Sequence, residues 1–305
     1  KAAASPEAAI IVWDVETLGD SPTYGYGNPK PGQIVNRIPA LLHLCRKAVF
    51  AQLLARLRAL LPSGSPLECG YIPRQWALPQ QASVLAAHVQ KSAAKAKRNG
   101  IAAPMYIVKP DGGSQGDGIT LTPDPCRPTW VASKERVVQE YIRDPLLVGG
   151  LKFDLRLYVL VCQGRAFLCR EGLARFAVDE YVKPSRENIR NVHMHLTNYS
   201  LNKKAEGFRH SDAADGGDDG SKRTASSVFA ALAAAGVVGD VEALWGEIGK
   251  LVSRTLAVLQ PVLQVCCGAS PTFKLLGFDV LLDSECRPWL IEVNDHPSLR
   301  IDLSY

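Results

Sequence analysis

The chain has 305 residues and a mass of 33.1 kDa, more than one hydrophobic core usually serves, so two or three lobes packed as one unit are expected. Its 47% hydrophobic and 21% charged residues exclude a disordered chain and a small domain held together by disulfides. The net charge of +5 suits an acidic macromolecular partner, but an ordinary solvated surface explains it equally well.

The first third of the sequence predicts one short strand and two helices. AAIIVWDV (8–15) is typical of a buried strand, and the Pro- and Gly-rich segment 21–32 is typical of a loop. Apolar residues then recur with helical spacing over 39–61, and the following PSGS ends that helix. An Ala-rich helix is expected over 82–99, where the dipole alone explains the basic residues near its C-terminal end.

The remainder of the sequence favours strands separated by loops and helices. In chain order we expect a strand at PMYIVKP that leads into a glycine-rich loop, strands at 136–142 and 153–161, a polar surface loop at 205–223, a helix at 224–260, and strands at 273–282 and 288–294. A strand-rich core with intervening helices favours an α+β fold over an all-helical one.

Cysteine usage and apolar runs constrain the surroundings of the protein. The eight cysteines show no CxxC pair and no zinc-type spacing, which predicts reduced thiols. No apolar run reaches the roughly 18 residues of a membrane helix, and the first residues lack the apolar centre of a signal peptide. We therefore expect a cytoplasmic protein with neither a membrane nor a nucleic acid as its partner, and, since residue 1 is lysine, a segment of a longer chain.

The last two strands predict a pair of facing carboxylates. We take 285–286 as a two-residue turn, so that Ser284 pairs with Arg287. Counting outward from that pair places Asp279 directly opposite Glu292. Two carboxylates about 5 Å apart repel each other unless a cation neutralises them.

A third oxygen ligand lies on the same face, because Asn294 is two residues beyond Glu292. Three hard oxygen ligands with open positions suit Mg²⁺ bound to nucleotide phosphates. The alternative is that these acids are unrelated surface groups or form ion pairs with a neighbouring Lys or Arg. The register is expected to be fixed by burial of the apolar residues on the other face, which are Phe278, Val280, Leu282, Trp289, Ile291 and Val293.

The glycine-rich segment YIVKPDGGSQGDGITL places Lys109 at the end of an apolar strand and four glycines directly after it. Glycines let backbone N–H groups approach phosphate oxygens. Because the lysine precedes the glycines, this is neither a Walker A loop nor a Rossmann fingerprint. Taken alone, a plain hairpin connection explains the loop better, and only its combination with other motifs favours a phosphate site.

One such motif is KFDLRLYVL, in which Lys152, Asp154 and Arg156 share a strand face while the residues between them are apolar. Two cations can hold an anionic substrate while the aspartate fixes their rotamers. The preceding VVQEYI offers backbone groups that can meet the edge of an adenine. A solvated stripe of ion pairs over a packed core is the alternative.

Two further segments, EGLARF and HMHLTNYS, carry Arg175 and Asn198 where packing alone does not demand a polar residue. His193 and His195 are expected to be structural, because no third imidazole is near them in sequence. A protein kinase is excluded, because no HRD or DFG string is present.

Taken in order, GQIVNRIP, LCRK, IPRQWALP, YIVKPDGGSQGDGI, VVQEYI, LKFDLRLYVLV, EGLARF, MHLTNYSLN, GSKRT and LLGFDVLLD with PWLIEVNDHPSL resemble the tubulin tyrosine ligase-like family. The resemblance spans almost the whole chain, and GGSQGDG with GSKRT is most similar to the tubulin polyglutamylases. It implies one ATP-grasp catalytic unit with an N-terminal lobe at 1–44, a central lobe at 45–143 and a C-terminal lobe at 144–305, with ATP between the last two.

The resemblance also assigns roles to individual residues. Contacts to ATP are implied for Lys47, Lys109, Gly113, Gln115, Gly116, Lys152 and Asp154, and for the adenine hinge of Gln139, Glu140, Tyr141 and Ile142. Ligation of Mg²⁺ is implied for Asp279, Glu292 and Asn294. Contacts to the substrate and the transition state are implied for Asp154, Arg156, Arg175 and Asn198. One departure is Asp117, an anion in the glycine loop where many relatives carry a cation.

The implied reaction joins a glutamate carboxylate of an acidic tubulin or microtubule tail to the amine of free L-glutamate. ATP first converts the carboxylate to an acyl phosphate, and Arg175 then stabilises the oxyanion formed by amine attack. A monomer acting on the cytoskeleton, including the cilium or basal body, is expected. The alternatives are addition of glycine or tyrosine, a different acidic acceptor protein, and a catalytically inert module that binds tubulin.

Overall fold

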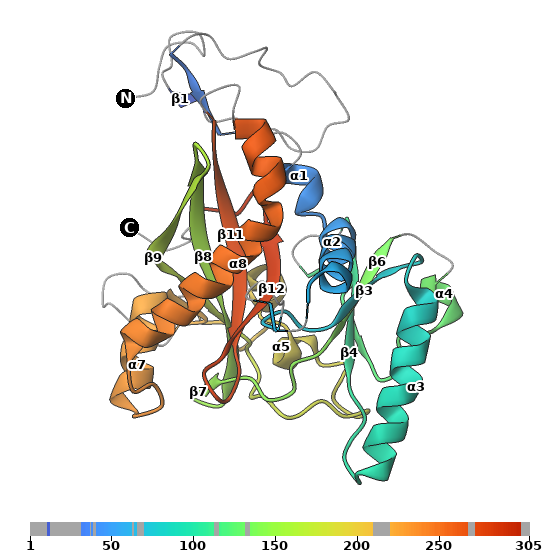
Figure 1. Ribbon diagram of the computed structural model, residues 1–305. Helices are drawn as coiled ribbons and strands as arrows, with labels where there is room; N and C mark the ends of the chain where they lie inside the picture. The colour runs from blue at the N-terminus through green and yellow to red at the C-terminus, as the bar shows by residue number, and fades with distance from the viewer. Residues whose placement is uncertain are drawn as a thin grey trace.

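The computed structural model contains two antiparallel sheets that stand beside each other, with helices on their outer faces and between them (Figure 1). It describes residues 11–12, 32–36, 38, 41–62, 64–65, 70–112, 116–131, 135–209, 220–267 and 272–299. The predicted loop at 21–32, except its last residue, and most of the predicted strand at 8–15 lie outside these ranges, as does the middle of the loop at 205–223.

Strands and helices are interspersed along the chain. The strands are β1 Ile11–Val12, β2 Ile34–Val35, β3 Gln75–Leu78, β4 Tyr106–Pro110, β5 Thr120–Thr122, β6 Arg136–Glu140, β7 Leu147–Val148, β8 Leu151–Cys162, β9 Arg165–Phe176, β10 Lys222–Thr224, β11 Phe273–Leu282 and β12 Pro288–Asn294. The helices are α1 Leu41–Leu44, α2 Lys47–Leu60, α3 Ala82–Arg98, α4 Pro128–Val131, α5 Val192–His195, α6 Tyr199–Asn202, α7 Ala225–Ala234 and α8 Val241–Cys267. This mixture of helices and antiparallel sheets confirms the α+β prediction.

The smaller sheet has the strand order β3-β6-β4-β5. Its alternate residues face opposite sides, so Trp76 and Val138 pack toward α3, whereas Ala77 and Val137 pack toward α2. Lys109 in β4 lies opposite Val137 and therefore belongs to the α2 side of the sheet. This register places the lysine on the face that meets the larger sheet.

The larger sheet has the order β10-β9-β8-β11-β12, and β7 pairs with the start of β8. Helices α7 and α8 cover one face of it, and α8 crosses the strands diagonally in Figure 1. Residues 153, 155 and 157 of β8 are buried in the main core on this side, as the alternation predicted. The opposite face, which carries the charged residues of β8, points toward the smaller sheet.

Helix α2 lies between the two sheets and packs against both. Its Phe50 and Leu54 belong to the main core of the larger sheet. Its small residues Ala48 and Ala51 pack closely against the smaller sheet. Because α2 begins at Lys47, its first turn is held where the two sheets meet.

Two predicted helices are interrupted. The segment predicted as one helix over 39–61 contains α1 and α2, separated at Cys45 and Arg46. The predicted 224–260 helix is split by Gly236, whose φ of 69° and whose N–H bond to Ala233 O end α7 in a Schellman motif. The side chain of Asp240 then caps α8 by accepting hydrogen bonds from two amides of its first turn.

The turn between β11 and β12 is one residue longer than predicted. The amide of Asp283 donates to Arg287 O at 3.0 Å, so Ser284 does not pair with Arg287. The turn residues are 284–286, and Cys286 adopts a positive φ of 60°. This is the three-residue hairpin loop that ends in a left-handed residue.

A β-bulge in β12 compensates for the longer turn. Val280 lies opposite Leu290, whereas Asp279 lies opposite Glu292, so Ile291 is the extra residue. The predicted pairing of the two carboxylates is therefore confirmed, although the two-residue turn and the regular register from which it was inferred were wrong.

The bulge also changes which residues of β12 are buried. Trp289 and Ile291 were predicted on the apolar face, but Leu290 takes that position and is 1% exposed. Trp289 instead donates from Nε1 to Asp283 Oδ2 at 2.9 Å, and Ile291 lines a cavity between the two sheets. The other predicted members, Phe278, Val280, Leu282 and Val293, are in the core.

Two general expectations concern cysteines and membranes. Cys45, Cys126, Cys162, Cys169 and Cys286 have free thiols, and the other three cysteines are not covered by this observation. Within the described ranges, no helix has both the length and the apolar character needed to cross a bilayer.

Candidate active site

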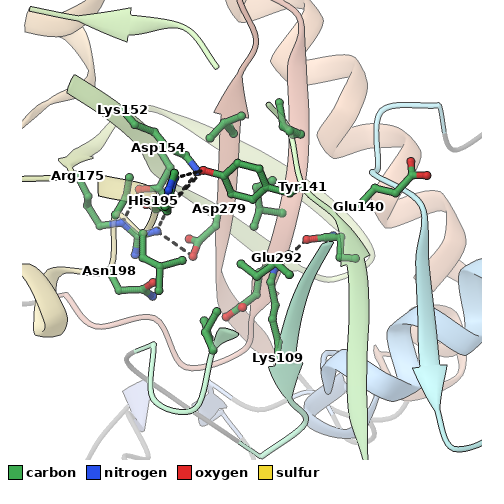
Figure 2. A pocket seen from close by; sticks show the side chains of 18 residues that line it. Lys109, Glu140, Tyr141, Lys152, Asp154, Arg175, His195, Asn198, Asp279 and Glu292 are labelled. Atoms are coloured by element: carbon green, nitrogen blue, oxygen red, sulfur yellow. Dashed lines mark hydrogen bonds and ion pairs between the residues drawn. The ribbon is translucent and has the colours of Figure 1, made fainter. Parts of the chain in front are cut away.

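Two adjoining cavities lie where the two sheets face each other. Figure 2 shows the residues that line the narrower one. The narrower cavity is bordered by β4, β6 and the residues after β6 on one side and by β8, β9, β11 and β12 on the other. The wider one, of about 470 Å³, extends from there toward α6 and the glycine loop. Their common wall consists of Lys109, Ile119, Arg175, Asn198, Asp279 and Glu292.

A network of ion pairs crosses three strands of the larger sheet. Arg175 in β9 lies opposite Asp154 in β8 and binds both of its carboxylate oxygens. A second nitrogen contact joins Arg175 to Asp279 Oδ2 in β11 at 2.9 Å. Asp279 also accepts from Arg156 Nη2 at 3.1 Å. The two guanidinium groups hold the pKa of Asp279 well below its usual range despite burial.

This network corrects one prediction and bears on another. Asp154 was expected to fix the cations of its own strand, but it binds Arg175 of the neighbouring strand. The reason is that Arg175 is its direct cross-strand partner, whereas Arg156 lies opposite Asp279. The alternative of ion pairing was left open for the hairpin acids, and Asp279 does pair with arginines, while Glu292 lies 3.7 Å from Lys47 Nζ.

Lys109 is the cation contributed by the smaller sheet. Its side chain is buried, and its ammonium group donates to Gln139 Oε1 at 2.8 Å. Burial lowers the pKa of Lys109 to about 8, although the charge of Glu292 opposes that shift. Gln139 also donates to Gln75 Oε1 at 3.1 Å, so this hinge residue orients the lysine with its side chain.

Lys152 at the start of β8 is a second buried ammonium group. It donates to Tyr141 Oη at 2.9 Å and to the backbone oxygen of His195 at 2.8 Å. Burial lowers the pKa of Lys152 to about 7. Both acceptors are uncharged, so the charge of Lys152 is incompletely compensated.

His195 was predicted to be structural, and its surroundings agree with that prediction. The ring is fully buried, with Nδ1 3.2 Å from Tyr141 Oη and Nε2 3.2 Å from Asn188 Oδ1. Desolvation lowers the pKa of His195 to about 4, so the imidazole is neutral at ordinary pH. His193 does not line either cavity.

The residues after β6 form the wall of the narrower cavity. The amide of Glu140 donates to Arg74 O and that of Tyr141 to Met105 O, each at 2.8 Å. The amide of Ile142 makes no backbone hydrogen bond to any residue in the described ranges. Apolar side chains complete this end of the cavity and are contributed by Ile107, Ile142, Leu281 and Ile291. A flat, apolar heterocycle with a hydrogen-bonding edge fits such surroundings.

The proposed metal ligands lie together at the wider cavity. Asp279 and Glu292 face each other across β11 and β12, and Asn294 lies one pleat further along β12. The Nδ2 atom of Asn294 is buried and has no hydrogen-bond partner in the described part of the chain. A half-turn of this amide would present an oxygen instead, which a hard cation satisfies.

The donor set fits Mg²⁺ held jointly with phosphates. The described residues contain no group of three His, Cys, Asp or Glu side chains that could hold a metal ion by themselves. Two carboxylates and one amide leave several coordination positions open, which Mg²⁺ usually fills with water and substrate phosphate oxygens.

The glycine loop approaches the larger sheet at Gly116. This residue has a φ of 86°, and a Cβ placed on it would lie 2.5 Å from Leu201 Cδ1. The adjacent Asn198 lines both cavities, while Asp117 lines the wider one and not the narrower one. Gly113 and Gln115 lie outside the described residues.

Sequence reasoning missed several residues of the wider cavity. Lys203 and Lys222 lie 5.6 Å and 5.1 Å from the centre of the Tyr199 ring, and all three line this cavity. Lys222 belongs to the GSKRT string, but no spacing rule linked it to Tyr199. Together the two cavities are lined by seven lysines and arginines and by five acids, so the site favours an anion.

Comparisons with known proteins show which sequences this chain is similar to. The model described as the Tubulin-tyrosine ligase family matches residues 27–305. The protein named Tubulin polyglutamylase TTLL11 of Mus musculus is 39% identical over 287 residues, which cover 89% of this chain and 38% of that protein. A protein of Tetrahymena thermophila named Probable beta-tubulin polyglutamylase is 36% identical over 289 residues, which cover 90% of this chain and 23% of that protein. The chain thus spans less than two fifths of these relatives.

Proposed function

The chain belongs to the tubulin-tyrosine ligase family, and from that premise we propose that it is the catalytic unit of an ATP-dependent tubulin polyglutamylase. The proposed reaction forms an amide between a glutamate side chain of a tubulin C-terminal tail and the amine of free L-glutamate. Names of the relatives support the substrate, since several are tubulin polyglutamylases. The microtubule cytoskeleton is then its proposed place of action.

The proposed architecture is an ATP-grasp unit with lobes at 1–44, 45–143 and 144–305. In it, ATP occupies the narrower cavity between the smaller sheet of the central lobe and the larger sheet of the C-terminal lobe. The apolar end of this cavity receives the adenine, and the Ile142 amide donates to its edge. The phosphates then extend past the two buried lysines toward the wider cavity.

Lys109, Lys152 and Lys47 are the proposed phosphate contacts. When the buried ammonium group of Lys109 or Lys152 exchanges a neutral acceptor for a phosphate oxygen, both partners of the new hydrogen bond are charged. Such a bond is stronger than one to a neutral acceptor. Asp279, Glu292 and Asn294 would hold Mg²⁺. That ion would supply Lewis-acid stabilisation of the charge that develops on the transferred phosphoryl group.

The wider cavity is the proposed place of amide formation. The acceptor carboxylate attacks the γ-phosphorus and becomes an acyl phosphate, with ADP leaving. The amine of free glutamate attacks the acyl carbon, loses a proton, and displaces inorganic phosphate. Arg175 and Arg156, already oriented by Asp154 and Asp279, are the proposed donors to the tetrahedral oxyanion, and Asn198 is a proposed substrate contact.

One observation carries this proposal. In a member of this family, two buried lysines share a cavity with the facing carboxylates of Asp279 and Glu292, and their acceptors among the described residues are uncharged. Burial of this kind disfavours the charged lysines unless an anion joins them. A Mg²⁺–polyphosphate complex is an anion that satisfies both the lysines and the carboxylates.

The test is incubation of the protein with tubulin, ATP, Mg²⁺ and glutamate, followed by mass spectrometry of the tubulin tails. We expect mass increments of one glutamyl residue, absent without ATP and absent in Glu292→Gln. Parallel reactions with labelled glycine or tyrosine determine which amino acid is added. If no amino acid is added to tubulin, but nucleotide binding still requires Mg²⁺ and Glu292, the acceptor assignment is wrong.

A catalytically inert tubulin-binding module makes a different prediction. It would bind tubulin whether or not nucleotide is present, and Mg²⁺–ATP would not bind to it. Titration with a fluorescent ATP analogue, with and without Mg²⁺, separates this possibility from the proposed ligase.

A further inference from the structure

A buried carboxylate outside the residues assigned so far joins the two elements that carry Lys47 and Lys109. Asp111 directly follows β4, and only 2% of its side chain is exposed. Its Oδ1 accepts a hydrogen bond from the Ala48 amide at 2.7 Å, and its Oδ2 accepts from Arg46 Nε at 2.9 Å. Both partners belong to the start of α2.

Asp111 supplies the N-terminal cap that α2 lacks locally. The residue at the N-cap position, Arg46, makes no side-chain hydrogen bond to the first turn. The carboxylate that bonds the Ala48 amide instead comes from 63 residues further along the chain. An acceptor at this position satisfies an otherwise unpaired amide, and its negative charge is favourable at the positive end of the helix.

The position of this cap matters because of the two residues beside it. Lys47 is the first residue of α2, and its ammonium nitrogen lies 3.7 Å from Glu292 Oε2. Lys109 is two residues before Asp111. Its pKa is lowered by burial and, to a smaller extent, by the positive charge of Lys47, while the charge of Glu292 opposes the shift. The two ammonium groups thus lie close enough to influence each other, and Asp111 joins the elements that carry them.

We propose that Asp111 is a positioning residue, which ties the start of α2 to the end of β4 and thereby sets Lys47 and Lys109 for the phosphates of the nucleotide. The role is indirect, since Asp111 lines neither cavity. It rests on the proposed function, in which both lysines contact ATP.

The test is a double-mutant cycle on nucleotide affinity. Kd for a Mg²⁺–ATP analogue is measured for the wild type, Asp111→Ala, Lys47→Ala and the double variant. We expect Asp111→Ala alone to weaken binding about tenfold, since losing a cap of this kind and its charged partner is worth on the order of 1 kcal/mol. In the Lys47→Ala background the same change should have less than about a threefold effect, because residues that act through one another are not additive.

Two single variants separate positioning from general stability. Asp111→Asn keeps an oxygen acceptor for the Ala48 amide, and it should restore most of the lost affinity. Glu135→Gln is the matched control, because Glu135 also contacts Arg46, at 3.3 Å, but is exposed and bonds no amide of α2 through its side chain. It should leave Kd unchanged. If the factors by which Asp111→Ala and Lys47→Ala raise Kd simply multiply in the double variant, the two residues act independently and the proposal is overturned.

A readout without nucleotide keeps this proposal distinct from the proposed function. Reductive ¹³C-methylation of lysines gives an NMR resonance for Lys47, assigned through its loss in Lys47→Arg. We expect this resonance to shift in Asp111→Ala and to stay in place in Glu135→Gln. If the Lys47 resonance shifts in Asp111→Ala but the wild type binds no nucleotide, the tie between α2 and β4 is supported and the ATP site is refuted. An unchanged resonance would refute the tie itself.

Discussion

The arginine network of the larger sheet and the region where the two sheets meet hold their cations in different states. On the larger sheet, Arg156 and Arg175 are bound by the carboxylates of Asp279 and Asp154. Where the sheets meet, the acceptors of Lys109 and Lys152 within the described part of the chain are an amide oxygen, a phenol and a backbone carbonyl. A paired charge is oriented before any ligand arrives, whereas a buried charge with neutral partners gains most from an incoming anion.

The comparison separates arginines whose charge is neutralised within the fold from lysines whose charge is incompletely compensated. The arginines are part of the folded framework, and their removal leaves buried carboxylates without partners. The lysines are disfavoured by their surroundings, as their lowered pKa values indicate. Measurements on both kinds of cation can break or sharpen this difference between the arginine network and the lysines.

The largest effect is expected for Arg175→Met. This change leaves Asp154 without its buried partner and removes one of two from Asp279, so the free energy of unfolding should fall by about 3–5 kcal/mol. Urea unfolding followed by tryptophan fluorescence measures the loss. A change below about 1 kcal/mol would mean that the network does not stabilise the fold.

The opposite behaviour is expected for Lys109→Met. Methionine fills a similar volume without a charge, so the free energy of unfolding should change by no more than about 1 kcal/mol. Affinity for Mg²⁺–ATP should nevertheless fall about hundredfold, as for the loss of a charged contact to phosphate. Urea unfolding and nucleotide titration on the same preparation check both halves, and a strongly destabilised variant would contradict the contrast with Arg175.

The pH dependence of nucleotide affinity should sharpen the contrast further. Lys152, with a pKa lowered to about 7, loses its proton as the pH rises, while bound phosphate favours the charged form. Affinity for Mg²⁺–ATP should therefore weaken between pH 7.5 and 9, by at most about tenfold per pH unit for this group. Titrations of the wild type and of Lys152→Met check this, since the variant should show a shallower dependence.

Stability without nucleotide should change in the other direction. Between pH 7 and 10.5 an unfolded Lys152 binds a proton that the folded protein does not, so the free energy of unfolding rises with pH across this window. Denaturant midpoints of the wild type, compared with those of Lys152→Met, isolate this contribution. A wild type whose stability falls relative to the variant as the pH rises would contradict the assignment.

The smallest effect is expected at an arginine–carboxylate pair on the surface. Arg170 Nη2 lies 2.5 Å from Glu242 Oε1, with 56% and 72% of the two side chains exposed. Glu242→Gln should leave the urea midpoint of unfolding unchanged, because water screens exposed pairs. A loss comparable to that of Arg175→Met would show that burial is not what separates the two pairs.

Local patterns in the sequence predicted much of this molecule. The bounds of β11 and β12, the α+β class and the shared face of Lys152, Asp154 and Arg156 follow from alternation, which burial enforces. The family membership followed from ordered motifs and is confirmed by the match over 27–305. The roles of the individual site residues stay predictions.

Other features could not be inferred from local patterns. The three-residue turn with Cys286 at positive φ and the bulge at Ile291 have no glycine to indicate them. The turn shifts the register by one residue and the bulge shifts it back, so the pairing of Asp279 with Glu292 is unchanged. The contacts of Arg175 with two strands and the cap of α2 by Asp111 depend on which strands become neighbours. Such pairings are set by tertiary packing, which no short window of sequence contains.

The shared guanidinium of Arg175 has a consequence for motion. It bonds to β8 and β11 while belonging to β9, so these three strands cannot slide past one another without separating buried opposite charges. A sheet fastened in this way is expected to keep the register of these three strands when a ligand binds.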